Sequence, residues 1–192
     1  EPSLASLGVG SIEVMPRKIL LVHPKLENEF KLRWVEGLRV GGLPFNYLGY
    51  AVELVDTDHL PAGALTGRYA GVVVWMSDAK VPPIEDQEIL TRWLTTQVEN
   101  DFPIALVNPA DFLLTNSIGT ALGLQTEDAS GADKLPIKIL QQSPLIAFET
   151  VPRPSISEFL GLQPPQGSES LITLQRGAFK QVAAAITPWG GY

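Results

Sequence analysis

Four short apolar runs, set apart by longer polar or helical stretches, constrain the fold of this chain most. The runs are rich in Val, Ile and Leu, a composition typical of parallel strands buried on both faces. They lie at residues 18–23, 50–56, 70–76 and 102–108. Their alternation with helical patterns up to residue 124 predicts an α/β fold with a doubly wound, flavodoxin-like parallel sheet.

Two helical patterns separate these runs. Residues 82–101 begin with two prolines and acidic residues and then repeat apolar residues at helical spacing, which predicts a helix. Its expected apolar face consists of Ile89, Leu90, Trp93, Leu94 and Val98. Residues 30–47 show a similar spacing, but glycines and a proline interrupt it. We therefore expect a kinked or divided helix there that ends at Gly49, and a short helix within 111–124 that ends near Gly123.

The pattern changes after residue 124. A polar loop at 125–134 is followed by short strand candidates joined by turns rich in Pro and Gly, which predicts an antiparallel or mixed β-rich extension. The candidates are residues 135–143, 144–151, 170–177 and 180–187. Residues 151–170 contain too many prolines for a regular element and are expected to form a surface excursion.

We divide the chain into a linker at 1–17, a flavodoxin-like domain at 18–124 and a β extension at 125–192. The extension either packs on that domain or leads to a following one. Both ends look cut, and the N-terminal stretch has neither the basic start nor the apolar segment of a signal peptide. We interpret the chain as a piece of a longer protein.

The charge and composition exclude several classes of function. With 14 basic and 21 acidic side chains, the net charge of −7 repels nucleic acid and anionic lipid, so we predict neither as a partner. A cationic polysaccharide remains compatible with this charge. The longest apolar stretch, 70–76, is too short to cross a bilayer. The chain contains no cysteine, which removes disulfides, thiolate nucleophiles and cysteine metal sites.

The loops that follow the strands lack the parts of a cofactor site or of a nucleophile elbow. The loop after the first strand reads "HPKLENEF" and offers two glutamates but no Gly, Ser or Thr, so it would repel a phosphate. We therefore predict no flavin, nucleotide or other cofactor. Ser77 has no small neighbour two residues before it, and Asn108-Pro109 carries no nucleophile, so we predict no catalytic residue in either turn.

The ends of the first three strands carry the best candidates for a ligand cleft. His23 ends the first strand, where a histidine is usually packed and hydrogen-bonded. Asp56, Asp58 and His59 form the strongest acid–base or metal-like group, although this spacing is also typical of a self-capping turn. No second histidine pair completes a zinc site, so no metal is predicted. The candidate cleft comprises His23, Asp56, Asp58, His59, Trp75 and Ser77.

Carboxylates and tryptophans that might act on a sugar have simpler explanations. Asp56, Asp78, Glu85 and Asp111 lie near strand ends, where the helix dipole already favours acidic residues. We expect Trp93 to lie in the core and Trp75 to end a buried strand from which it could reach the cleft, while Trp189 could contact a neighbouring domain. Packing explains each of these side chains better than contact with a ligand does.

Several phrases of the sequence resemble a known family. They read "LGVGSIEVMPRKILLV", "FNYLGYAVELVDTDHLP", "LTGRYAGVVVWMSD" and "ITPWGGY". They are similar to the middle region of the PelA family of periplasmic Pel exopolysaccharide hydrolases/deacetylases, which act in biofilm matrix production. The resemblance implies a periplasmic location and a parent enzyme with a glycoside hydrolase and a polysaccharide deacetylase domain. The catalytic residues of both would lie outside this chain.

This middle region also resembles the class I amidotransferase-like, flavodoxin-related modules of carbohydrate-active enzymes. Such modules can keep the fold while lacking the catalytic cysteine, and the present chain has none. The resemblance therefore implies a non-catalytic structural or docking domain. Its partners would be flanking domains of the same polypeptide, a polysaccharide or a protein of the secretion apparatus.

Two alternatives stay open. One is a carbohydrate-binding module that grips a partly deacetylated, cationic glycan in the cleft near His23, Asp56, Trp75 and Ser77. The other is an unrecognised hydrolase that uses Asp56, Asp58 and His59.

Overall fold

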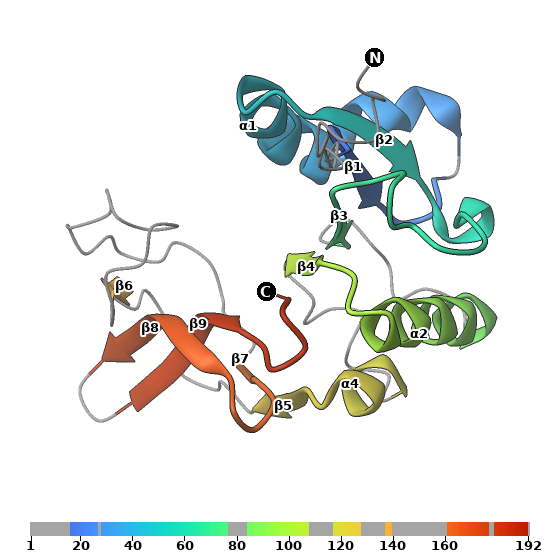
Figure 1. Cartoon of the computed structure of the whole chain (residues 1–192). Coiled ribbons are helices and arrows are strands. Elements are labelled where there is room, and N and C mark those ends of the chain that lie inside the picture. The colour runs from blue at the N-terminus through green and yellow to red at the C-terminus, as the bar shows by residue number, and fades with distance from the viewer. Residues whose placement is uncertain are drawn as a thin grey trace, which may run out of the picture.

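A parallel sheet of four strands forms the centre of the structure, a computed structural model (Figure 1). The structure describes residues 16–26, 28–76, 84–107, 117–127, 137–139, 161–176 and 179–191. The strands follow the order β2-β1-β3-β4, and all neighbouring pairs are parallel. Their bounds are β1 Lys18–Val22, β2 Ala51–Val55, β3 Gly71–Trp75 and β4 Ile104–Val107. The predicted α/β fold with a parallel sheet is confirmed.

Alternate residues of the central strands point to opposite faces of the sheet, as the pleat requires. On one face Leu20 and Val74 join a buried cluster with Leu90 and Leu94 of the long helix α2, which spans Ile84–Glu99. On the other face Leu21 and Trp75 lie against Gly37. Helical segments therefore cover both faces, which is the doubly wound arrangement.

The segment between β1 and β2 is divided, as expected, and it has one break more than the sequence suggested. It consists of a 3-10 helix, η2, at Glu29–Trp34, a π-helical turn, η3, at Gly37–Gly41, and α1 at Gly42–Tyr47. The change from η3 to α1 falls at Gly41 and Gly42, as their pattern predicted, whereas the break at Val35 was not expected. Gly37 permits a close approach, because a Cβ atom there would lie 3.0 Å from the Cβ of Trp75.

Helix α2 matches the predicted element except at one position. Leu90 and Leu94 are fully buried, and Trp93 packs against the core cluster while its Nε1–H donates to the carbonyl oxygen of Pro61 at 2.9 Å. Ile89, placed on the apolar face by its spacing, is 48% exposed, so this prediction was wrong. Ile89 lies at the edge of the buried stripe, beside the loop that follows β2. Within the described residues, no helix is long and apolar enough to cross a membrane.

The C-terminal part forms two small antiparallel sheets. Strands β6 (Ile137–Ile139), β8 (Glu169–Arg176) and β9 (Phe179–Ile186) pair in the order β6-β8-β9. The other sheet pairs β5 (Gln125–Glu127) with β7 (Gly161–Gln163). Helix α4 (Ser117–Leu122) precedes them and ends at Gly123, whose φ of 72° suits a glycine.

The pairing of β5 with β7 corrects two predictions. Residues 125–127 were expected in a polar loop and residues 161–163 in a proline-rich excursion, yet each forms a strand. The two segments satisfy each other's backbone groups across a long sequence separation, and neither pattern shows this by itself. The strand expected at 144–151 lies outside the described residues.

Trp189 connects the end of the chain to the main domain. Its Nε1–H donates to the carbonyl oxygen of Leu122 at 3.4 Å, and its ring packs against the core cluster. Within this chain, this side chain therefore lies against the end of α4. The turn that follows β9 therefore contacts the α/β domain, next to β4 (Figure 1).

Candidate functional site

The carboxyl end of the sheet brings together part of the predicted cleft. Val22 of β1 pairs with Val55 of β2 and with Val74 of β3. The next residue of each strand therefore lies in one row, which places Asp56, His23 and Trp75 side by side. Asp58 and His59 follow in a short 3-10 helix, η4, at Thr57–His59. Ser77, Asp78 and Asp111 lie outside the described residues.

Asp56 caps η4. Its Oδ1 accepts the backbone N–H groups of Asp58 and His59, both at 3.1 Å, and lies 2.6 Å from Nδ1 of His59. Burial raises the pKa of Asp56, but the hydrogen bond and charge of His59 and the Asp58 N–H outweigh it, so the pKa lies below its ordinary value. Asp56 is therefore ionised at neutral pH and acts as the cap of a turn.

His23 and Asp58 also have local partners. His23 is 4% exposed, and its Nδ1 lies 2.7 Å from the carbonyl oxygen of Pro24. Because a carbonyl only accepts, Nδ1 carries the proton in this contact. Asp58 forms an ion pair with Lys25, whose pKa is raised by that hydrogen bond and charge. Among the residues described, no three His, Asp or Glu side chains are grouped to hold a metal ion.

The side chain of Trp75 packs against η3. Cβ atoms built on Gly37 and Gly41 would both lie within 3.2 Å of its side chain, so η3 covers the ring. Its Nε1–H donates to Oε2 of Glu36 at 3.4 Å. The row at the strand ends thus combines a capping carboxylate, a buried histidine and a covered indole.

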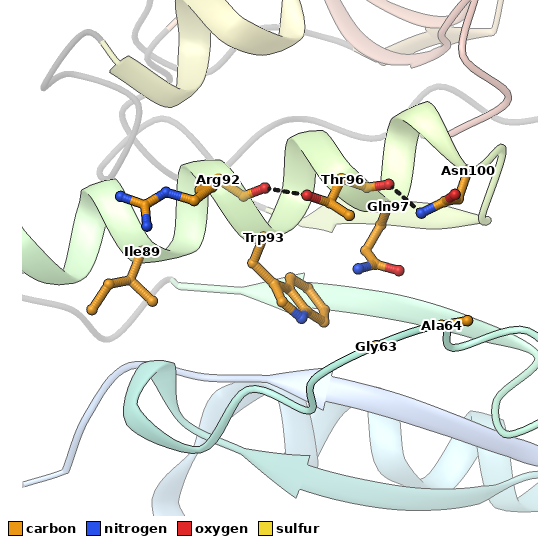
Figure 2. Close-up of a pocket in the computed structure, with 8 residues that line it drawn as sticks. All are labelled: Gly63, Ala64, Ile89, Arg92, Trp93, Thr96, Gln97 and Asn100. Atoms are coloured by element: carbon orange, nitrogen blue, oxygen red, sulfur yellow. Dashed lines mark hydrogen bonds between the residues drawn. The ribbon is translucent and has the colours of Figure 1, made fainter.

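A separate pocket of about 440 Å³ lies between α2 and the loop that follows η4 (Figure 2). Gly63 and Ala64 form its loop side, and α2 supplies residues at positions three and four apart, which share one helix face. These helix residues are Ile89, Arg92, Trp93, Thr96, Gln97 and Asn100. Sequence reasoning missed this pocket; the one available signal was a glutamine beside the apolar stripe of the helix.

A second feature missed from the sequence is an exposed apolar surface on the segment between β1 and β2. Tyr47 is 90% exposed, Leu43 76% and Trp34 59%. We call this surface the η2–α1 face; it consists of Trp34, Val40, Leu43, Tyr47 and Leu48. The guanidinium groups of Arg33 and Arg39 lie 5.5 and 5.7 Å from the centre of the Trp34 ring.

Comparison with known proteins identifies the fold. No protein-family model matches the chain, and no curated protein matches it. A glutamine amidotransferase from Thermotoga maritima superposes on 91% of this chain and 73% of its own, with a TM-score of 0.62 and 9% identity. A putative ThuA-like protein from Bacteroides uniformis superposes on 87% of this chain and 71% of its own (TM-score 0.58, 14% identity). The chain has a class I glutamine amidotransferase-like fold.

A similar fold also occurs inside a much longer protein. An exo-β-1,4-mannosidase from an Opitutaceae bacterium superposes on 92% of this chain but on only 30% of its own length, with a TM-score of 0.57 and 13% identity. At such low identities these likenesses establish the fold alone. They do not test the resemblance to the Pel family, which stays a prediction.

Proposed function

We propose that this chain is a non-catalytic docking domain of a periplasmic polysaccharide-modifying enzyme of the Pel exopolysaccharide type. The observation that carries the proposal is the η2–α1 face. Val40, Leu43 and Tyr47 are spaced three and four residues apart and all point outward, although this segment covers the sheet with its other side. A cluster of large apolar side chains exposed in this way usually marks a protein interaction site.

The composition supports a non-catalytic role. The amidotransferase-like fold is present, but the chain has no cysteine to serve as the nucleophile of an amidotransferase. Two polar groups described at the carboxyl end of the sheet are engaged in structural contacts: Asp56 caps η4, and His23 bonds to Pro24.

The proposed occupant of the η2–α1 face is a glycan-hydrolysing domain of the same polypeptide. The mannosidase supports this choice, since a fold like this one makes up 30% of that longer enzyme. The Pel family resemblance leads to the same expectation, because it implies a hydrolase domain next to this region. Burying Trp34 and Tyr47 would supply the aromatic anchors that dominate many interfaces.

Hydroxyl-radical footprinting tests this proposal on the isolated 192-residue chain and on the full-length parent enzyme. We expect oxidation of Trp34 and Tyr47 to fall several-fold in the parent, while oxidation of Trp93 on the opposite face stays the same. Equal oxidation of Trp34 and Tyr47 in both proteins would contradict docking through this face. Hydrolysis or deacetylation of Pel oligomers by the isolated chain would contradict its non-catalytic role.

A second candidate function is supported by the contact between His59 and Asp56. A carboxylate 2.6 Å from Nδ1 orients an imidazole for acid–base chemistry, and the His59 side chain is 76% exposed at the carboxyl end of the sheet. A hydrolase built on this pair would lose turnover on His59→Ala with unchanged folding. Full activity of that variant in the parent enzyme would exclude this candidate.

A further inference from the structure

The pocket beside α2 contains a buried polar atom without a partner. Gln97 is 2% exposed, and its Oε1 is buried without a hydrogen-bond partner. Leaving such an oxygen unsatisfied costs about 1–3 kcal/mol, so native proteins rarely keep one without a reason. Figure 2 shows the Gln97 side chain pointing from α2 toward the loop of Gly63 and Ala64, together with the ring of Trp93.

The neighbouring polar groups of the helix are already bonded. Thr96 donates its hydroxyl to the carbonyl oxygen of Arg92 at 2.9 Å, and Nδ2 of Asn100 donates to the carbonyl oxygen of Thr96 at 2.7 Å (Figure 2). Gln97 is thus the side chain in this pocket that needs a partner, and its free oxygen requires a donor. A hydroxyl or an amide N–H of a ligand would supply it.

Trp93 gives the pocket an apolar wall. Its Nε1–H is held by the carbonyl oxygen of Pro61 at 2.9 Å, which fixes the orientation of the indole, and the side chain remains partly exposed. A fixed indole next to polar amide groups suits a flat molecule with one C–H face and hydroxyl groups on its rim. The volume of about 440 Å³ falls within the usual range for small-molecule pockets, about 300–1,000 Å³.

Arg92 is the one charged residue among those that line the pocket. A ligand with a free ammonium group would be repelled by its guanidinium, whereas a neutral ligand would not. We propose that this pocket binds one neutral, hydroxyl-rich sugar ring, with Gln97 accepting from a hydroxyl or acetamido N–H and Trp93 lying under the ring. A turn about the last torsion of Gln97, which is broad for an amide, would aim Oε1 at the ligand.

This site is independent of the proposed docking function. The pocket lies on α2, whereas the segment that carries the η2–α1 face packs on the opposite side of the sheet. It also differs from the cleft expected at His23, Asp56 and Trp75, and it favours a neutral sugar over a cationic one.

The test is an NMR titration of the 192-residue chain with glucose, N-acetylglucosamine and glucosamine. We expect glucose or N-acetylglucosamine to shift the indole N–H signal of Trp93 and leave that of Trp34 unchanged. Glucosamine should bind more weakly, and Arg92→Ala should reduce this difference. No shift of Trp93 with either neutral sugar at about 10 mM, or a shift of Trp34 instead, would overturn the proposal.

Gln97→Leu separates binding from folding. This variant keeps the side-chain size but removes the unsatisfied oxygen, so we expect at least about tenfold weaker sugar binding, or 1.4 kcal/mol, with an unchanged or higher Tm. Glu99→Gln, on the same helix but outside the pocket, should bind as the wild type does. Equal affinity of the Gln97→Leu and wild-type proteins would overturn the proposal. If Gln97→Leu fails to fold, the indole shifts of the wild type decide the question.

Discussion

Gly191 packs so closely against Ile104 that a Cβ atom on the glycine would lie 2.5 Å from the Ile104 carbonyl oxygen. The same atom would overlap the ring of Trp189. Thr187 closes this turn, since its N–H donates to the carbonyl oxygen of Gly191 at 2.8 Å. The end of the β extension is therefore fastened to the parallel sheet at a position where only glycine fits.

Gly191→Ala should destabilise the chain by about 1–3 kcal/mol, because the added methyl group forces the turn away from β4. Thermal unfolding would measure the loss as a lower Tm. Gly190→Ala is the matched control: its φ of 77° strains an alanine, but no atom lies within 4 Å of the new Cβ. A smaller loss in Gly191→Ala than in Gly190→Ala would contradict the packing described here.

Substitution by alanine should destabilise the chain strongly at Leu94 and hardly at all at Leu43. Leu94→Ala removes a fully buried side chain from the core cluster and should cost about 2–5 kcal/mol. Leu43→Ala, on the η2–α1 face, should change the free energy of unfolding of the isolated chain by no more than about 0.5 kcal/mol. Urea unfolding of both variants tests this, and a large loss in Leu43→Ala would mean that this chain itself covers the face.

Asp56 should make the free energy of unfolding fall at acidic pH. Its folded pKa is lowered, so its contribution is present above the ordinary pKa of about 3.9 and is lost as pH falls through the lower folded value. Asp56→Ala should cost about 1 kcal/mol at pH 7, as for other caps, and less at about pH 2.

Asp56→Asn keeps an oxygen acceptor for the cap but does not titrate. We expect this variant to retain part of the stability at pH 7 and to lose the acid dependence that Asp56 contributes. Urea unfolding of all three proteins at both pH values measures these differences. An equal cost of Asp56→Ala at both values would show that the carboxylate does not stabilise η4.

The phenol of Tyr69 should lose its proton at a higher pH than an ordinary tyrosine does. Burial raises the pKa of its phenol, and the hydrogen bond to Glu53, with the OH 2.8 Å from Oε1, raises it further. A raised pKa means that the stabilisation is complete below the ordinary value of about 10 and is lost as pH rises through the folded value.

Absorbance at alkaline pH would follow this titration, and Tyr69→Phe should remove one phenol step above pH 10. The variant should cost about 0.5–1 kcal/mol at pH 7, a modest loss because the Glu53 side chain is 41% exposed to solvent. Tyr69→Ala, which also empties a core position, should cost about 3–5 kcal/mol. A titration curve unchanged by Tyr69→Phe would contradict the raised pKa.

The strands of the main sheet could be predicted to within a few residues because each is an apolar run, which is most continuous in the central strands β1 and β3, where both faces are buried. The capping role of Asp56 was also readable, since a carboxylate two and three residues before free N–H groups satisfies them locally. The exposure of Ile89 could not be predicted. Helical spacing shows which residues share the apolar face of a helix, but not which of them neighbouring elements cover.

The sequence alone determined the α/β class, the order of the four strands of the main sheet and of helix α2 along the chain, and the absence of a thiol nucleophile. Tertiary structure decided which strands pair across long separations, as β5 with β7, and which side chains stay uncovered, as Leu43 and Tyr47. It also decided that Gln97 is buried without a partner for its oxygen. The physical reason is that burial and hydrogen-bond satisfaction depend on atoms distant in sequence, whereas strand and helix formation reflect residues that are close together in the chain.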